Sequence, residues 1–219
     1  MFKHRKRSRL GGYTFVELLM SMSILTIGVG GIAAMQKVTV SSNQHARNLA
    51  TATQISQAWL DELRADSAAW NHPSSRLATS DLADTQWLSA LASSGGSTTG
   101  WFRPAWQATR NFGPGFDVQG RPVNTTDPDN NAQVRYCTHL RLSWLYRDTG
   151  STVADQQAVI GNGLIRAEVR IFWVREGQTA YGTGDVCGGV TPAATIGAAT
   201  TRYHFVYQVS AVRQNTASQ

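Results

Sequence analysis

The pattern of apolar and polar positions begins with one continuous apolar stretch. Residues 13–36 are all uncharged except Glu17. A helix over this stretch is about 36 Å long at roughly 1.5 Å per residue, whereas the hydrocarbon core of a bilayer is about 30 Å thick. The pattern therefore predicts a membrane-spanning helix.

Residues 37–66 have the pattern of an amphipathic helix. At about 100° per residue, one sector gathers the apolar side chains and the far side is polar. No proline occurs between residues 13 and 71, and Pro73 supplies a stop signal. We therefore expect one spine helix over residues 13–66, and its second half carries an apolar stripe made by Val38, Leu49, Ala52, Trp59, Leu60 and Leu63.

Residues 67–133 show only short patterns, and we expect a variable region of loops. A short helix is predicted over residues 81–92, with Ser80 as its N-cap. Residues 93–100 are all Gly, Ser or Thr and indicate a surface loop. Residues 118–123 indicate a small hairpin that turns at Gln119 and Gly120.

Residues 134–219 carry the clearest β pattern. Apolar and polar residues alternate over residues 134–147, 165–173 and 203–211. Three such strands predict an antiparallel sheet whose apolar face is covered by the spine helix, which gives an α+β fold. We expect the other face to be solvated and to present Arg135, His139, Arg141, Arg166, Arg170 and His204.

Composition bounds the domain count and the charge. A chain of 219 residues is long enough for one sizeable soluble domain after the anchor. Five of the 20 Lys and Arg residues lie within residues 1–9, and all 14 acids follow Gly12. The chain from Tyr13 onward therefore has 15 basic residues against 14 acids, a net charge of +1, so its net charge gives no indication of nucleic-acid binding.

Glu17 is the unusual residue of the apolar stretch. A carboxylate there costs about 2.5 to 3.5 kcal/mol near the centre of a bilayer and less near its edge, so it needs a partner. A secretory signal peptide has a shorter apolar core without an acid. An ordinary anchor with a cytoplasmic N-terminus fits the length and the basic residues 1–9, but it leaves Glu17 unexplained.

The run Gly12, Tyr13, Thr14, Phe15, Val16, Glu17 resembles the processing site of type IV prepilins and pseudopilins. In that family a basic leader is cut after the Gly, and the next residue becomes an N-methylated terminus. A Glu lies five residues beyond the Gly. After cleavage, the terminal amine of a neighbouring subunit would be a partner for this carboxylate in a low-dielectric surrounding. The resemblance implies a leader at residues 1–12, cleavage between Gly12 and Tyr13, methylation of Tyr13 and a role in subunit assembly for Glu17. Tyr13 departs from the commoner Phe.

Residues 24–64 extend the resemblance to PilV-type minor pilins. The implied organisation is a leader at 1–12, a membrane and filament-core helix at 13–36, its amphipathic half at 37–66, a variable region at 67–133 and a disulfide-bonded sheet at 134–219. Gly28, Gly30 and Gly31 fall inside the membrane helix. They indicate either close helix packing or a place where the helix loosens in a filament.

Cys137 and Cys187 are the only two cysteines. Outside the cytoplasm such a pair indicates a disulfide, here between the first strand and the connection of the second to the third. The alternative is a pair of free buried thiols. A zinc site is not indicated, because the CxxC and HxxxH spacings are absent.

Motifs of catalysis are missing from the sequence. It has no GxSxG, no phosphate-binding glycine loop and no paired acids. His139 and His204 would bind a metal only if they met across the sheet, and Asp127 and Asp129 lie in a turn that offers oxygen ligands for calcium. We expect no catalytic residue, no cofactor and no metal.

These observations favour a non-catalytic minor pilin of a type IV pilus. We expect an inner-membrane protein with a cytoplasmic N-terminus and a periplasmic domain, which then enters the filament at the cell surface. Its expected partners are prepilin peptidase, major and minor pilins, the pilus assembly machinery and a tip adhesin, and no nucleic acid. The alternatives are a minor pseudopilin of a type II secretion system and, in a different class, a membrane-tethered periplasmic binding or enzymatic domain.

Overall fold

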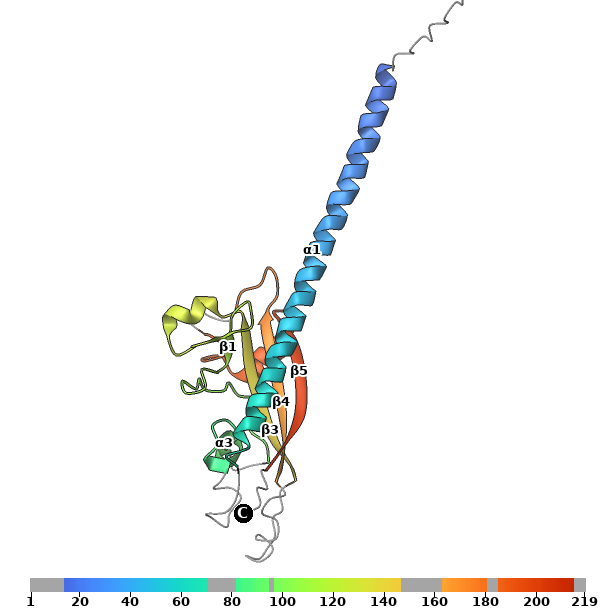
Figure 1. Cartoon of the computed structure of the whole chain (residues 1–219). Coiled ribbons are helices and arrows are strands. Elements are labelled where there is room, and N and C mark those ends of the chain that lie inside the picture. Colours follow the sequence, from blue (N-terminus) through green and yellow to red (C-terminus); the bar gives the residue numbers. More distant parts are fainter. Residues whose placement is uncertain (1–13, 71–81, 95–96, 147–162, 181–184, 215–219) are drawn as a thin grey trace, which may run out of the picture. The chain divides into compact units, whose positions relative to one another are not determined.

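The computed structural model describes residues 14–70, 82–94, 97–146, 163–180 and 185–214 (Figure 1). Two compact units are present, Met1–Asn48 and Leu49–Gln219. The helices are α1 (Phe15–Asp66), α3 (Ser89–Ser93), the 3₁₀ helix η1 (Pro128–Gln133) and α5 (Ala193–Ala198). The strands are β1 (Gly115–Phe116), β2 (Pro122–Val123), β3 (Tyr136–Tyr146), β4 (Leu164–Val174) and β5 (Tyr203–Arg213).

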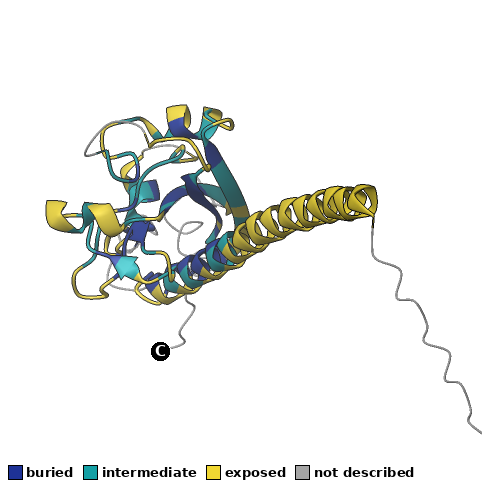
Figure 2. Ribbon diagram, turned by 90° about the horizontal axis from the view of Figure 1, so that it is seen from above, coloured by how far each residue is buried: buried dark blue, intermediate teal, exposed yellow. Residues whose placement is uncertain are grey.

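Helix α1 is unbroken over 52 residues, as the absence of proline predicts. Figure 2 shows its first part exposed and its last part alternating between buried and exposed positions. The buried positions, Ala52, Ile55, Ser56, Trp59, Leu60, Leu63 and Asp66, follow the three- and four-residue spacing of one helix face. The amphipathic half of the predicted spine helix is therefore confirmed from Ala52 onward, whereas Val38 and Leu49 are exposed.

The sheet is antiparallel throughout and has five strands in the order β2-β1-β3-β4-β5. The three long strands correspond to the three predicted runs. In the register of the sheet, Leu140 lies beside Val169, which lies beside Gln208. The α+β class and the packing of the spine helix on an antiparallel sheet are thus as predicted.

The core of the second unit lies between α1 and one face of the sheet, which we call the helix face. Trp59 and Leu63 of α1 are fully buried, as are Leu140 and Val169 of the sheet. Trp59 contacts the rings of Trp87 and Phe112 edge to face, at centroid distances of 5.3 and 4.7 Å. Large side chains that interdigitate in this way supply most of the apolar area removed from water.

The short helix predicted over residues 81–92 is wrong in extent. Its expected cap, Ser80, lies outside the described residues, and a turn and bends at residues 84–88 separate the first residues from α3. The apolar positions of the prediction are nevertheless right, because Leu82, Trp87, Leu88 and Leu91 are all buried.

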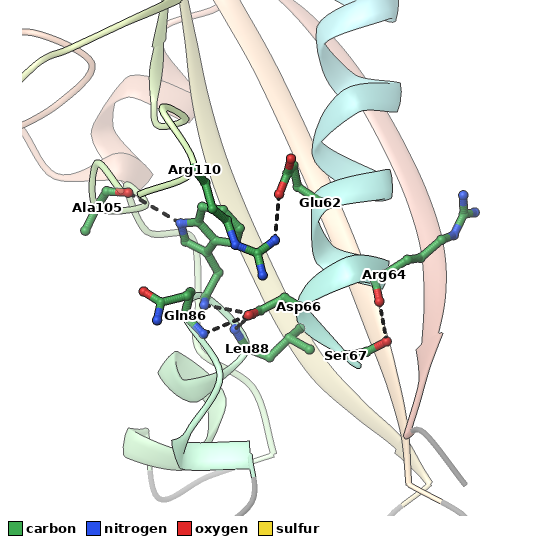
Figure 3. A network of polar contacts seen from close by, with 9 residues as sticks. Glu62, Arg64, Asp66, Ser67, Gln86, Leu88, Ala105 and Arg110 are labelled. Carbon is green, nitrogen blue, oxygen red and sulfur yellow. Dashed lines mark hydrogen bonds and ion pairs between the residues drawn. The ribbon is translucent and has the colours of Figure 1, made fainter. Parts of the chain in front are cut away.

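The reason for the interruption is the buried carboxylate of Asp66, at the end of α1 (Figure 3). It accepts hydrogen bonds from the backbone N–H groups of Gln86, Trp87 and Leu88 at 2.8, 2.9 and 3.1 Å. Bonds to a charged acceptor are stronger than the neutral bonds of a helix, so they hold these residues in an open turn. The turn thereby fixes Trp87 against Trp59.

The predicted hairpin is present as β1 and β2. The backbone N–H of Gly120 donates to the carbonyl of Asp117 at 3.1 Å, and Gly120 has φ +80°, which favours glycine. The Asp117 carboxylate accepts from the N–H groups of Gln119 and Arg121, each at 2.8 Å. An aspartate that bonds the backbone two residues on is typical of such turns.

The prediction of one solvated sheet face is wrong. On β5 the residues that face the helix are Val206, Ser210 and Val212, and the aromatic positions face the other way. Phe205 pairs in register with Phe172, and the two rings lie 6.2 Å apart. Phe172, Tyr203 and Ile196 of α5 form a second apolar cluster on this side, which we call the outer face.

Candidate functional site

The first candidate site is the exposed apolar part of α1. Large hydrophobic side chains from Phe15 to Val40 are between 48% and 77% exposed, with no side of the helix reserved for polar groups. Within the described residues this is the one helix that is long and apolar enough to cross a membrane. An apolar surface of this size needs lipid or other protein to cover it.

Glu17 lies in the first turn of α1, where a negative charge is favourable to the helix dipole. Its backbone N–H donates to the Thr14 hydroxyl at 3.3 Å, and the N–H of Leu18 donates to the Thr14 carbonyl at 3.2 Å. Ser or Thr followed three residues later by Glu is the sequence of a capping box. Thr14 was not singled out from the sequence, although the spacing of Thr14 and Glu17 was sufficient to find it.

Gly12 and Tyr13 lie outside the described residues, as does the expected leader at residues 1–12. The predicted cleavage and methylation position therefore stays a prediction. Among the described residues, the Glu17 carboxylate has no hydrogen bond and no ion pair. Its charge is available to a group outside the part of the chain that is described.

Gly28, Gly30 and Gly31 lie inside the continuous helix. A Cβ added at any of the three would meet no atom within 4 Å. The chain itself therefore gives no steric reason for glycine at these positions. Of the two interpretations, close packing would have to involve another chain, and loosening would have to occur in a state other than this one.

The second candidate site lies on the outer face around His139, which was expected to be solvated and is fully buried. Arg170 Nη2 donates to His139 Nδ1 at 2.7 Å and to the Ala193 carbonyl at 2.6 Å. Because a guanidinium has only donors, His139 Nδ1 must accept, so its Nε2–H donates to the Cys187 carbonyl 2.9 Å away. The imidazole is therefore neutral, with both nitrogens satisfied.

The pKa of His139 is lowered to about 4, mainly by burial; the charges of Arg170 and Arg103 act in the same direction, whereas the Cys187 carbonyl and the charge of Asp185 oppose the shift. A proton on Nδ1 would place a donor against the donor of Arg170. This histidine is consequently a structural hydrogen-bonding residue, and near neutral pH it has no proton to donate from Nδ1.

Arg170 is also buried, which corrects its assignment to a solvated face. Its guanidinium carbon lies 4.4 Å from the centroid of the Trp101 ring, and that of Arg141 lies 4.9 Å from the same ring. Trp101 reaches this position because the neighbouring backbone pairs with β3, where Phe102 N donates to the Leu140 carbonyl at 2.9 Å. Trp101 was missed because nothing near it in sequence indicates a strand.

Glu168 connects two further arginines of the outer face, Arg141 and Arg166. Its carboxylate is bonded by Arg141, with Nε at 3.0 Å, and by Arg166, with Nε at 2.9 Å. Arg166 is 47% exposed in its side chain, whereas Glu168 is only 7% exposed as a residue. The arginines thus serve partly as the solvated face that was predicted and partly as a buried network.

The disulfide between Cys137 and Cys187 is present. It joins β3 to the connection between β4 and β5, as the sequence predicted, and it lies next to the His139 network because Cys187 supplies the carbonyl that His139 bonds. The two features hold the same connection against the outer face.

The residues considered for metals are used in other ways. The Asp127 carboxylate accepts from Asp129 N at 3.0 Å and from Asn130 Nδ2 at 3.2 Å, so it caps η1. His204 stacks on Trp173, on the helix face, and does not meet His139 on the outer face. Over the described ranges, no group of three or more His, Cys, Asp or Glu side chains gathers in a way that could hold a metal ion.

Compared with protein-family models, with curated proteins and with solved structures, the chain gives no match in any of the three.

Proposed function

We propose that the chain is a minor pilin, a non-catalytic subunit of a type IV pilus. The observation that carries the proposal is the combination in α1 of a wholly exposed apolar surface with a single carboxylate at its beginning. The same helix continues into the core of the second unit. A helix that anchors in a membrane and also belongs to a folded domain fits a subunit that is held in the inner membrane and then packed into a filament.

The proposed role of Glu17 follows from electrostatics. A charge without a partner in an apolar surrounding is strongly unfavourable, whereas a paired charge is tolerated. If residues 1–12 are removed, Tyr13 carries a free amine four residues before Glu17 in the sequence. An amine of one subunit that pairs with Glu17 of the next would set the register between them rather than add much stability.

We propose that the protein is located first in the inner membrane and then in the filament. It is first a single-pass protein of the inner membrane, with residues 1–9 in the cytoplasm and the second unit in the periplasm, where the disulfide can form. After processing by prepilin peptidase it packs against other minor and major pilins, primes or modifies the filament and offers its folded unit to the assembly machinery or a tip protein. The same architecture would serve a secretion pseudopilin, and gene neighbourhood separates the two.

The first test is the mass of the N-terminal peptide of the protein purified from cells. The proposal expects a chain that begins at Tyr13, with the mass of one added methyl group. A chain that keeps residues 1–12 would instead be a membrane-tethered domain, and the proposal would be wrong.

The second test separates assembly from helix capping. Glu17→Ala and Glu17→Gln should be processed and then be absent from sheared filaments, because both remove the charge. Thr14→Ala removes the capping hydroxyl and keeps the charge, so it should still be incorporated. Incorporation of Glu17→Gln at the normal level, measured by immunoblot of sheared filaments, would contradict the pairing.

A further inference from the structure

Strand β5 forms one edge of the sheet, because β4 is its one neighbour in the strand order of the described residues (Figure 1). It has 11 residues, and its register with β4 continues without a bulge from end to end. The other edge, β2, has 2 residues, and one of them is Pro122. Short strands, prolines, lysines and bulges protect an edge from pairing with another chain, so β2 is protected and β5, which has none of these features, is not.

The backbone groups of β5 alternate in direction. At the two ends of its ladder with β4, Arg175 N donates to the Arg202 carbonyl and Gln214 N donates to the Gly163 carbonyl, each at 2.9 Å. Because the register is continuous, the even-numbered residues of β5 bond to β4 and the odd-numbered ones direct their N–H and C=O groups away from the sheet. In the described part of the chain, no backbone hydrogen bond takes up these outward groups at Phe205, Tyr207, Val209 and Ala211.

The side chains beside this free edge are apolar and accessible. Tyr207 and Val209 lie on the outer face, and each is 53% exposed. The ring of Phe205 stacks on that of Tyr207 at a centroid distance of 6.0 Å, which orders this part of the surface. A strand added to β5 would cover these side chains with its own, because opposed residues of an antiparallel pair lie on the same face.

The far end of the edge is basic. Arg213 ends β5, Arg166 lies beside Ala211 in register, and both arginines are exposed. Glu168, the one acid of the three long strands, is already bonded by Arg141 and Arg166. An added strand that carries an acid opposite Ala211 is therefore favoured over a neutral or basic one.

The direction of α1 argues against a second copy of the chain as the partner. The Thr51 side chain bonds to that of Tyr136, whose ring lies 5.7 Å from the ring of Trp173, beside the start of β5. Arg64 Nη2 donates to the Ser210 hydroxyl at 3.2 Å, near the end of β5. Within the second unit, α1 and β5 therefore run the same way.

Two copies of β5 related by a two-fold axis would pair antiparallel. Their α1 helices would then run in opposite directions, although each helix continues into an apolar stretch that needs to be covered by the same membrane. A strand from another polypeptide has no such conflict.

We propose that the free edge of β5 binds an extended segment of a different polypeptide as an additional antiparallel strand. The outward backbone groups of residues 205–211 bond to the segment. Its apolar side chains cover Tyr207 and Val209, and a carboxylate faces Arg166 and Arg213. The proposal does not depend on entry into a filament, since β5 lies within the second unit.

The test uses the full chain in nanodiscs of zwitterionic lipid and a peptide of sequence Glu-Thr-Glu-Thr-Val-Thr-Val-Thr-Val with a fluorescent dye at its C-terminus. Laid antiparallel to β5, its first residue lies opposite Arg213 and its last opposite Phe205. Fluorescence anisotropy should show saturable binding at micromolar concentration of the protein. No saturation up to millimolar concentration would overturn the proposal.

Two isomeric peptides test the backbone pairing. N-methylation of the third, fifth and seventh residues removes N–H groups that face β5, and it should weaken binding at least about thirtyfold. N-methylation of the second, fourth and sixth residues alters N–H groups that face away, and it should change the affinity less than about threefold. Equal losses for the two isomers would overturn the proposal.

Hydrogen exchange measured by NMR locates the bound strand. The amides of Tyr207 and Val209 should exchange fast in the free chain and at least about tenfold more slowly with saturating peptide, whereas those of Val206 and Gln208, which bond to β4, should be slow in both. Slow exchange of Tyr207 and Val209 without peptide would show that the edge is already paired. That result would overturn the proposal.

Variants of the edge complete the test. Val209→Pro removes an outward N–H without touching the ladder to β4 and should abolish binding, whereas Val209→Thr keeps the N–H and should bind within about threefold of the wild type. Arg213→Glu should weaken binding about fivefold, and a peptide with Lys as its first residue should restore it. Equal affinities of Val209→Pro and Val209→Thr would contradict the pairing.

A second copy as the partner is tested by sedimentation of the full chain in mild detergent. The proposal expects no dimer that depends on β5. A dimer that Val209→Pro dissociates and Val209→Thr preserves would overturn the proposal in favour of self-pairing. An unchanged melting temperature shows that each variant is folded, and the methylated peptides test the pairing on the wild type if the proline variant does not fold.

Discussion

The two faces of the sheet differ in the kind of interaction that holds them. On the helix face, Leu140 and Val169 meet the apolar stripe of α1, and packing alone suffices. On the outer face, the alternate positions of the same strands carry His139, Glu168 and Arg170, which are equally buried. There each polar group needs a partner in the right place, since an unpaired one in a low-dielectric interior is costly.

The comparison teaches that the burial of a face does not determine how well that face tolerates substitution. An apolar face can repack after a change of shape, because any nearby methyl group restores part of the contact. The outer face cannot, because the His139 bonds have one arrangement of donors and acceptors. The following changes are ordered from the largest expected effect to the smallest.

Trp59→Ala tests the helix face and should lower the free energy of unfolding by about 4 kcal/mol, the cost of a large cavity at a fully buried ring. Urea unfolding of the full chain in mild detergent, followed by near-UV circular dichroism, measures it. Gln57→Ala, on the exposed side of the same helix, is the control and should cost less than about 0.5 kcal/mol. Similar values for the two would mean that the helix face carries little of the stability.

Removal of the disulfide tests the outer face as a whole. Cys137→Ser combined with Cys187→Ser opens a loop of 50 residues and should cost about 4 kcal/mol in the chain-entropy model, or somewhat less than Trp59→Ala if residual structure remains. The same urea experiment on oxidised and reduced wild-type chain is the reference. A loss under about 1 kcal/mol would show that packing alone holds the connection.

The pH dependence of stability tests the His139 network. Because the pKa of His139 is lowered to about 4 in the folded chain, the unfolded chain binds the proton first as the pH falls below about 6.5. Stability should therefore decrease between pH 6.5 and 4, by about 3 kcal/mol from this residue. The contribution is fully present above pH 6.5.

The difference between the wild type and His139→Gln isolates this effect from the titration of carboxylates. His139→Gln should have a flatter profile over the same range, although it is less stable at neutral pH. His45→Gln, at an exposed position of α1, should keep the slope of the wild type. Parallel profiles for His139→Gln and wild type would rule out the network as the source.

Arg166→Ala should have the smallest effect, below about 0.5 kcal/mol, because an exposed guanidinium contributes little and Glu168 keeps its bond to Arg141. Thermal unfolding of the full chain measures it. The contrasting variant is Arg170→Met. Arg170 lies four residues further along β4 on the same face, and its replacement should lower the free energy of unfolding several times more. Equal effects would mean that the two arginines do not differ as their burial indicates.

The helix face could be predicted from the sequence because a single rule governs it. The spacing of Trp59, Leu60 and Leu63 on a helix, and the alternation of the strands, both follow from the need to remove apolar groups from water. The disulfide could be predicted from the presence of two cysteines. The interruption of the helix near Trp87 could not be predicted, because its cause is the carboxylate of Asp66, which is distant in the sequence.

The outer face could not be predicted by alternation, which separates two faces of a strand without saying which one meets the helix. The register decides, and it places Phe205 beside Phe172 and away from α1. One signal was present in the sequence. Phe172 and Cys137 occupy positions that alternation assigns to the solvated face, and neither residue type is common in contact with water. A helix long and apolar enough to cross a membrane was predicted from the length of the apolar stretch and is present, but Gly12 and Tyr13 lie outside the described residues.

The final strand, β5, contributes to both apolar clusters, with Val212 on one side and Tyr203 on the other. A nascent chain therefore cannot complete the outer-face cluster before translation has passed residue 203, nor the helix-face cluster before it has passed residue 212. A product that ends before residue 203 exposes two unfinished cores at once, which makes such incomplete molecules easy for a protease to recognise and remove.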